Sequence, residues 1–210
     1  MTAAGGRLRV GVLVSGRGSN LQALLEASTR ADYPAQVVVV ISDRERAAAL
    51  DRARAAGVEA LFVNPKDFVD REAFDLALVR ELTARRVGLV CSAGFMRILS
   101  PAFTRAFAGR AINIHPSLLP AFPGLHAQRQ ALDHGVKVAG TTVHFLDDGA
   151  VDSGPIILQA SVPVQPDDTE DTLSARILAE EHRLYPEAVR LFAEGRLAVV
   201  GRRVVVRGQR

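Results

Sequence analysis

Residues 8–20, LRVGVLVSGRGSN, carry an apolar run of strand-favouring residues directly into a turn with two glycines, and a helical pattern follows from Asn20 to Arg30. At such a junction the backbone N–H groups and the helix dipole favour a bound phosphate. The glycine pattern matches a dinucleotide-binding fingerprint only in part, because Leu21 stands at the third glycine position, although Asp43 ends the next strand and is available to a ribose. The segment therefore predicts the start of a nucleotide-binding α/β fold, and a glycine turn without a ligand remains the alternative.

Strand and helix patterns alternate through the first half of the chain. The expected strands are continuous apolar runs, which is typical of strands buried on both faces. The pattern predicts strands over 8–15, 36–42, 60–63 and 87–92, and helices over 20–30, 47–56 and 67–85. This alternation indicates an α/β fold built on a Rossmann-like, doubly wound, mostly parallel sheet.

The second half is richer in strand patterns and extends that sheet. Residues 116–124 hold three prolines and a glycine and predict a rigid loop. A long helix is expected over 169–194, started by a capping arrangement at Asp168 and Thr169 and kinked or broken at Tyr185-Pro186. The other expected elements are strands over 111–115, 138–145 and 155–164, a helix over 127–134, and a hairpin over 197–206 that turns near Gly201 and Arg202.

We interpret residues 1–210 as one domain with the active site between its two halves. The halves are an α/β part over about 8–110 and a β-rich part over about 111–195, followed by a C-terminal hairpin or tail over 196–210.

The composition is that of an ordinary globular protein, with 48% hydrophobic residues, 23% charged residues and a net charge of +3. No basic run is interleaved with aromatic residues, so we expect no nucleic-acid partner. The single cysteine, Cys91, lies in an apolar run and is expected in the core. The chain lacks an apolar run of about 20 residues, and Met1–Gly6 lacks the apolar stretch of a signal peptide. We therefore expect a cytoplasmic protein that does not bind membranes.

Asn113 and His115 are the leading candidates for chemistry. In an extended segment they project to the same side, while Ile112 and Ile114 point into the core. An amide N–H and a protonated imidazole can both donate to an oxygen that becomes negative during acyl transfer. Asp152, in Asp152-Ser153-Gly154-Pro155, is the best candidate for a carboxylate that orients the imidazole. A capped turn without catalysis remains the alternative on spacing alone.

Longer blocks of sequence resemble a known family. These blocks are VSGRGSNL at 14–21, GFMRILS at 94–100, NIHPSLLP at 113–120, FPGLH at 122–126 and GTTVHF at 140–145. They are similar to the phosphoribosylglycinamide formyltransferases, folate-dependent enzymes of purine synthesis, and the similarity extends from about Arg9 to about Gly195. The resemblance implies a formyltransferase fold and transfer of the formyl group of 10-formyltetrahydrofolate to the amine of glycinamide ribonucleotide.

The resemblance also assigns roles to the candidate residues. Asn113 would donate to the formyl oxygen, His115 would stabilise the oxyanion, and Asp152 would pair with His115 and assist proton removal, without a metal. His126 is expected to support Asn113 or Asp152, whereas His144 is expected to be structural. The ribonucleotide and its phosphate would contact Gly18, Ser19, Asn20 and Glu181, and the folate would contact Arg71, Met96, Arg97, Ile98, Leu99 and Asn113.

Some of these assignments have plain alternatives. Without the resemblance, residues 96–99 would be a buried lead into a helix, and Arg71 would lie on a solvated helix face. The loop that ends at Asp152 looks one residue longer than in common family members, so Asp147 or Asp148 could take its place.

Three other functions share features with this sequence. Methionyl-tRNA formyltransferase and formyltetrahydrofolate hydrolase share the chemistry but need further domains that do not fit in 210 residues. A non-catalytic dinucleotide-binding module is the alternative from another class. The expected partners are glycinamide ribonucleotide and folate, and the chain is expected to be a monomer or a homodimer.

Overall fold

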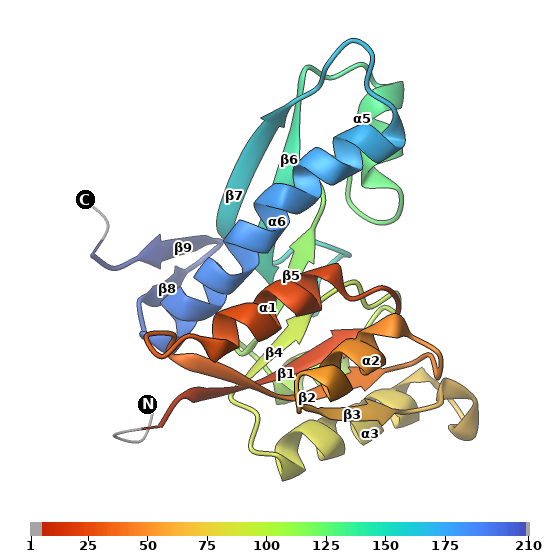
Figure 1. Cartoon of the computed structure of the whole chain (residues 1–210), viewed down its shortest axis with the longest axis vertical. Coiled ribbons are helices and arrows are strands. Elements are labelled where there is room, and N and C mark those ends of the chain that lie inside the picture. Colours follow the sequence, from red (N-terminus) through yellow and green to blue (C-terminus); the bar gives the residue numbers. More distant parts are fainter. Residues whose placement is uncertain (1–5, 209–210) are drawn as a thin grey trace.

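A nine-stranded sheet runs through the whole molecule (Figure 1), with the strand order β3-β2-β1-β4-β5-β6-β7-β9-β8. The computed structural model describes residues 6–208. Residues 1–5, which include most of the Met1–Gly6 segment, and residues 209–210 lie outside the described part.

Five neighbouring strands form the parallel part of the sheet. They are β1 (Leu8–Val14), β2 (Ala35–Ser42), β3 (Glu59–Phe62), β4 (Leu89–Ser92) and β5 (Ala111–His115). The carboxyl ends of parallel strands meet at one edge of a sheet, which is where ligands bind in open α/β folds. The predicted α/β fold with a mostly parallel sheet is confirmed.

The second half adds strands in mixed directions. β6 (Val138–Phe145) is antiparallel to both β5 and β7 (Ile156–Pro163). β8 (Leu197–Val200) and β9 (Arg203–Val206) form the predicted C-terminal hairpin, which joins the sheet where Arg203 pairs with Ile156.

Helices cover both faces of the parallel strands. α1 (Ser19–Thr29), α2 (Ala48–Ala55) and α6 (Glu170–Ala193) share one apolar core with Val10, Val12 and Val14 of β1. α3 (Arg71–Ala84) and α4 (Pro101–Ala106) share a second core with Leu13. Successive side chains of a strand point to opposite faces, so β1 contributes to both cores. α5 (Ala127–Asp133) contributes Ala131 to a third, smaller core, to which α6 contributes Leu173 and Ile177.

In the α3–α4 region one predicted helix start was wrong and one helix was missed. The helix predicted from Asp67 begins at Arg71, after the short 3-10 helix η1 (Pro65–Asp67), because the Asp70 carboxylate caps it by accepting from the Ala73 N–H at 2.8 Å. α4 was not predicted, although Ser100-Pro101 is a helix-start signal, with Pro101 at the first helical position.

A kink or a break was predicted at Tyr185-Pro186; a break there is wrong, because α6 continues through Pro186 to Ala193. Interactions on both sides of the proline hold the helix in place. The Tyr185 hydroxyl donates to the Ser92 carbonyl at 2.8 Å, and the Tyr33 hydroxyl donates to the Pro186 carbonyl at 2.8 Å. The predicted cap is confirmed, since Thr169 Oγ1 accepts from the Thr172 N–H at 3.2 Å.

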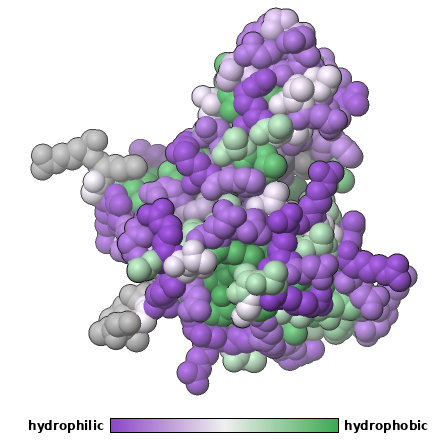
Figure 2. All heavy atoms as spheres, in the orientation of Figure 1, coloured by the Kyte–Doolittle hydropathy of each residue, from purple (hydrophilic) through white to green (hydrophobic). Residues whose placement is uncertain are grey.

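Hydrophilic residues cover most of the face drawn in Figure 2, and apolar surface appears there only in smaller patches. Among residues 6–208, no helix combines the length and apolarity needed to cross a bilayer. Cys91 is fully buried in β4, as predicted, and burial raises the pKa of its thiol.

Candidate active site

Three adjacent strands end beside one another and carry the candidate residues. β4 lies between β1 and β5 and pairs with both in parallel. The glycine-rich loop, defined here as residues 15–18, follows β1, and residues 94–99, here called the 94–99 loop, follow β4. Asn113 and His115 end β5. The sheet therefore brings the predicted phosphate, folate and catalytic segments to the same edge.

His115 and Asp152 form a buried pair. His115 Nδ1 lies 3.3 Å from Asp152 Oδ2, and the side chains are 6% and 10% exposed. The other ring nitrogen, Nε2, lies 2.8 Å from the Phe122 carbonyl oxygen. Both ring nitrogens thus face oxygen acceptors, and only a doubly protonated imidazolium donates to both.

The loop that carries Phe122 is held by β6 and β7. The Leu119 N–H donates to Thr142 Oγ1 at 3.1 Å, and Gln159 Nε2 donates to the Leu119 carbonyl at 2.9 Å. Ser117 Oγ donates to the Ala121 carbonyl at 2.6 Å. Sequence reasoning predicted a rigid loop from its prolines but missed these contacts, which place a backbone carbonyl against His115.

Asp152 is fixed as an anion. Burial alone would raise its pKa, but the contact with His144, the Gly124 N–H at 2.9 Å and the neighbouring His115 together hold the pKa of Asp152 below its ordinary value. Its backbone has a φ of 56°, in the left-handed region that aspartate and asparagine tolerate better than most residues.

Asn113 uses its amide group within the site. Its Nδ2 lies 3.3 Å from Asp152 Oδ1 and 3.3 Å from His144 Nε2. His144 Nδ1 donates to the Phe145 carbonyl at 2.9 Å. Nε2 of a neutral His144 accepts from Asn113, whereas Nε2 of a doubly protonated His144 donates to Asp152, and it is this second form that helps to lower the pKa of Asp152. The predicted neighbourhood of Asn113, His115 and Asp152 is therefore found, with His144 as a fourth member.

The structure places His144, and not His126, beside Asn113 and Asp152. His126 is exposed, precedes α5 with a φ of 58°, and makes no side-chain hydrogen bond to Asn113 or Asp152. His144 is 1% exposed, lies directly opposite Asn113 in the β5–β6 register, and is 3.5 Å from Asp152 Oδ1. The supporting contact predicted for His126 is made by His144.

The glycine-rich loop leaves backbone donors free. Gly18 precedes α1 with a φ of 72°, and a Cβ at this position would approach Ala49 Cβ to 2.6 Å, so both the conformation and the space require glycine. Glycine has no side chain to cap the helix. The N–H groups of Ser19, Asn20 and Leu21 make no hydrogen bond to the described residues.

Glu181 lies next to this loop in a buried position. It is 6% exposed, and Asn20 Nδ2 donates to its Oε2 at 2.7 Å. Burial raises the pKa of Glu181 to about 7, although hydrogen bonds from Asn20 and Thr141 partly oppose this. Asn20 and Glu181 were each predicted to contact the ribonucleotide, and the structure joins the two side chains by a hydrogen bond.

The 94–99 loop is fixed at its start and immediately after its end. The Met96 N–H donates to Ser15 Oγ at 2.9 Å, and the Ser100 N–H donates to Asp75 Oδ2 at 2.5 Å. Between these anchors, the backbone groups of residues 97–99 make no hydrogen bond within the described chain. Met96 and Ile98 are more than half exposed. This segment thus offers unpaired backbone groups and apolar side chains to a flat heterocycle.

Arginines flank this segment. The Arg97 guanidinium lies 5.1 Å from the centroid of the Phe74 ring, and Arg71 opens α3 and is exposed. Sequence reasoning named Arg71 and residues 96–99 but missed Ser15 and Asp75, whose short side chains gave no local signal of contacts across the fold.

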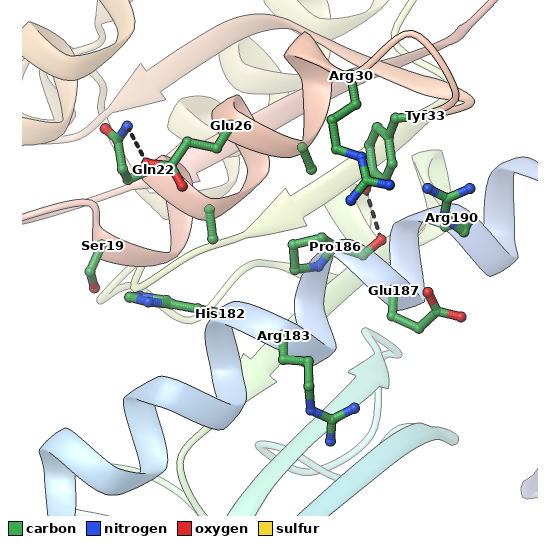
Figure 3. A pocket seen from close by; sticks show the side chains of 12 residues that line it. Ser19, Gln22, Glu26, Arg30, Tyr33, His182, Arg183, Pro186, Glu187 and Arg190 are labelled. Atoms are coloured by element: carbon green, nitrogen blue, oxygen red, sulfur yellow. Dashed lines mark hydrogen bonds between the residues drawn. The ribbon is translucent and has the colours of Figure 1, made fainter.

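A groove of about 730 Å³ lies between α1 and α6 (Figure 3). It begins at Ser19, and the ring of His182 points toward that end. Burial lowers the pKa of His182, and its Nε2 has no hydrogen-bond partner among residues 6–208. Arg190 and Tyr33 line the far end. The groove shares Ser19 with the predicted phosphate site but is not lined by Asn113, His115 or Asp152.

In the described part of the chain, no group of three or more His, Cys, Asp or Glu side chains is arranged to hold a metal ion.

Comparisons with known proteins agree with this arrangement. Residues 8–189 match the family described as Formyl transferase. The chain belongs to this family. The chain is 46% identical to the phosphoribosylglycinamide formyltransferase of Escherichia coli (strain K12), over 97% of this chain and 95% of the relative. A crystal structure of glycinamide ribonucleotide transformylase 1 from Symbiobacterium toebii matches with a TM-score of 0.94 and 58% identity, covering 98% of both chains.

The chain also resembles one segment of much longer proteins. It is 52% identical to the trifunctional purine biosynthetic protein adenosine-3 of Drosophila melanogaster over 90% of this chain. The chain spans only 14% of the length of that protein and of its Drosophila pseudoobscura counterpart. The resemblance recognised from the sequence blocks is confirmed.

Proposed function

We propose that this chain transfers the formyl group of 10-formyltetrahydrofolate to the amine of glycinamide ribonucleotide, a step of de novo purine biosynthesis. The observation that carries the proposal is the buried His115–Asp152 pair, with 3.3 Å between Nδ1 and Oδ2, at the end of a strand next to two ligand-competent loops. Relatives matched over nearly their whole length carry the name phosphoribosylglycinamide formyltransferase, which supports the same reaction.

The amine attacks the formyl carbon directly. A bond forms between the amine nitrogen and that carbon, and the bond from the carbon to N10 of the folate breaks. The tetrahedral intermediate carries a negative oxygen, which positioned donors stabilise. Since the amine is itself the nucleophile, the reaction requires neither a covalent enzyme intermediate nor a metal.

His115 supplies the positive charge near this oxygen. One ring N–H must leave its present acceptor to reach the substrate. We assign this role to Nε2, which exchanges the Phe122 carbonyl for the oxyanion, while Nδ1 keeps the negatively charged Asp152. Hydrogen bonds at catalytic sites are often long before the substrate binds. Asn113 similarly exchanges one of its two 3.3 Å contacts for the formyl oxygen.

Asp152 holds the imidazolium and assists proton movement. Its lowered pKa makes it a weak base, and we assign to it the orientation of a water molecule through which the proton leaves the attacking amine. The proton balance closes when N10 of the departing folate takes up a proton.

The two substrates approach from adjacent loops. The ribonucleotide phosphate binds at Gly18, Ser19 and Asn20, supported by their free N–H groups, and Glu181 contacts the ribonucleotide. The pterin lies along residues 96–99 with Arg71 nearby, supported by the unpaired backbone of residues 97–99. We assign the reaction to the cytoplasm, with no nucleic-acid or membrane partner, and the assembly to a monomer or homodimer.

The decisive experiment follows the loss of the formyl group from 10-formyltetrahydrofolate. We expect rapid loss with glycinamide ribonucleotide present and almost none without it. Loss without the amine would indicate a hydrolase, and loss only with methionyl-tRNA would indicate the tRNA enzyme. Saturable binding of NAD(P) without formyl transfer would favour the dinucleotide-binding alternative.

A further inference from the structure

Ser15 joins the two substrate loops. It is 1% exposed and directly follows β1. Its N–H donates to the Gly94 carbonyl at 3.1 Å, and its Oγ accepts from the Met96 N–H at 2.9 Å. One residue thus makes a backbone contact and a side-chain contact with the 94–99 loop.

The same residue begins the glycine-rich loop. Gly16 follows it, and the Gly16 carbonyl accepts from the Ala49 N–H at 3.1 Å. Gly18 then precedes α1, whose first N–H groups have no hydrogen-bond partner among residues 6–208. Ser15 is therefore three residues from one end of the proposed phosphate site.

On the folate side, the contact lies immediately before the segment with the unpaired backbone. The β1–β4 pairing continues past the strand ends through the Ala93 N–H and the Leu13 carbonyl at 2.9 Å, so the start of the loop is held by main chain. The Ser15 hydroxyl fixes the loop further along, because it accepts a hydrogen bond from the Met96 N–H. The next fixed point is Ser100, whose N–H donates to the Asp75 carboxylate. Residues 97–99 lie between Met96 and Ser100 and make no backbone hydrogen bond in the described chain.

We propose that Ser15 is a positioning residue that couples the two substrate sites, so that the ribonucleotide and the folate strengthen one another's binding through its hydroxyl. This inference rests on the proposed function. A phosphate bound at Ser19 and Asn20 restricts residues 16–18 and hence Ser15. A restricted Ser15 holds the Met96 N–H, so the folate meets an ordered segment and loses less conformational entropy on binding. The coupling is reciprocal, because linked binding free energies must be.

Calorimetry on the full chain tests this with two ligands that cannot react together, tetrahydrofolate and glycinamide ribonucleotide. In the wild type, saturating ribonucleotide should tighten tetrahydrofolate binding at least about five-fold, the lower end of usual coupling factors. In Ser15→Ala the factor should fall below about two-fold, because the acceptor for Met96 is gone. Ser15→Cys retains volume with a weak acceptor and should behave in the same way.

Ser42→Ala is the matched control. Ser42 ends the adjacent strand β2, is fully buried, and its Oγ accepts from the Arg44 N–H at 3.0 Å. It holds a turn rather than the 94–99 loop. This variant should lose comparable stability and keep the wild-type coupling factor.

Hydrogen exchange provides a local readout. Ribonucleotide alone should slow exchange of the Met96 amide in the wild type and in Ser42→Ala, but not in Ser15→Ala. Equal coupling in Ser15→Ala and the wild type, or equal loss in Ser15→Ala and Ser42→Ala, would overturn the role of Ser15. A wild type that binds both ligands independently would overturn the coupling while sparing the proposed function. A wild type that binds neither ligand would overturn both.

Discussion

Replacing Asp152 by asparagine removes one negative charge and almost no volume. The left-handed backbone at φ 56° suits asparagine as well as aspartate, so the change adds no strain there. Asparagine can still accept from the Gly124 N–H or from the Asn113 amide, but it cannot serve both as the two carboxylate oxygens do. We therefore expect Asp152→Asn to fold and to bind both substrates.

The loss should appear in the chemical step. Unit charges separated by 3.3 Å, the distance from Asp152 Oδ2 to His115 Nδ1, interact by about 5 kcal/mol at an effective dielectric constant near 20. Each factor of ten in rate corresponds to about 1.4 kcal/mol, so losing most of this interaction lowers kcat by roughly 10³-fold or more. The Asp152 side chain is 10% exposed, so water solvates part of the positive charge of His115 when the carboxylate is lost. We therefore expect a loss in kcat of roughly 10³-fold rather than the larger loss that the full interaction of about 5 kcal/mol implies.

The assay is steady-state loss of the formyl group from 10-formyltetrahydrofolate, together with calorimetric affinities for both substrates. Asp147→Asn is the matched control, because Asp147 lies in the same loop, is exposed, and contacts Gly149 and Ser153 instead of His115. It should keep turnover within about two-fold. Near-normal kcat in a folded Asp152→Asn protein would refute the reasoning, and a large loss in Asp147→Asn or Asp148→Asn would move the role to that residue.

Three further predictions concern the neighbouring residues. Asn113→Ala should lower kcat on the order of 10²-fold with little change in folate affinity, since its amide acts on charge that develops in the transition state; equal losses in kcat and in calorimetric affinity would indicate a structural role. Ser19→Asp should raise KM for the ribonucleotide on the order of 10²-fold and spare folate binding, because a carboxylate at the start of α1 repels the phosphate; unchanged KM, or no competition by inorganic phosphate in the wild type, would remove this loop from the site. Glu181→Gln should change how the free energy of unfolding depends on pH. The pKa of Glu181 is about 7 in the folded protein and 4.5 ordinarily, so between these values the folded wild type holds a proton that the unfolded chain releases. The stability contributed by this proton is complete below about pH 4.5 and is lost as the pH rises to 7. Urea unfolding should therefore show Glu181→Gln gaining roughly 3 kcal/mol relative to the wild type between pH 4 and pH 8, and a constant difference would contradict the raised pKa.

Much of the fold was predictable because its signals are local. Continuous apolar runs predicted β1, β2 and β4 to within one or two residues, and Thr169 marked the start of α6. The failures came where distant contacts outweighed a local signal. Pro186 lacks the N–H that an α-helix uses, yet Tyr33 and Tyr185 hold the helix across it.

Some residues of the candidate site could be predicted from the sequence and others could not. Asn113 and His115 share one strand, so their common face follows from the period of two. Asp152 lies 37 positions further along the chain from His115, so no periodicity relates the two, and Asp152 was a candidate from its place in Asp152-Ser153-Gly154-Pro155 and from the family resemblance. Ser15 and Asp75 gave no signal, because a serine or an aspartate at a strand end or on a helix has many ordinary roles.

The exchange of His126 for His144 has a definite structural cause. Residues directly opposite one another in an antiparallel pair lie on the same face, and the β5–β6 register places His144 opposite Asn113. A slip of one residue would turn His144 to the other face of the sheet, so its contact with Asn113 depends entirely on that register. The 22 residues between His115 and Val138 connect β5 to β6 and so set the register. They include the loop whose Leu119 backbone contacts Thr142 and Gln159, and the periodicity of the sequence does not predict the path of this connection. His126 lies closer to His115 in the chain, but it precedes α5 with an exposed side chain. In this site, strand register is therefore a better guide to the neighbours of a candidate side chain than distance along the sequence.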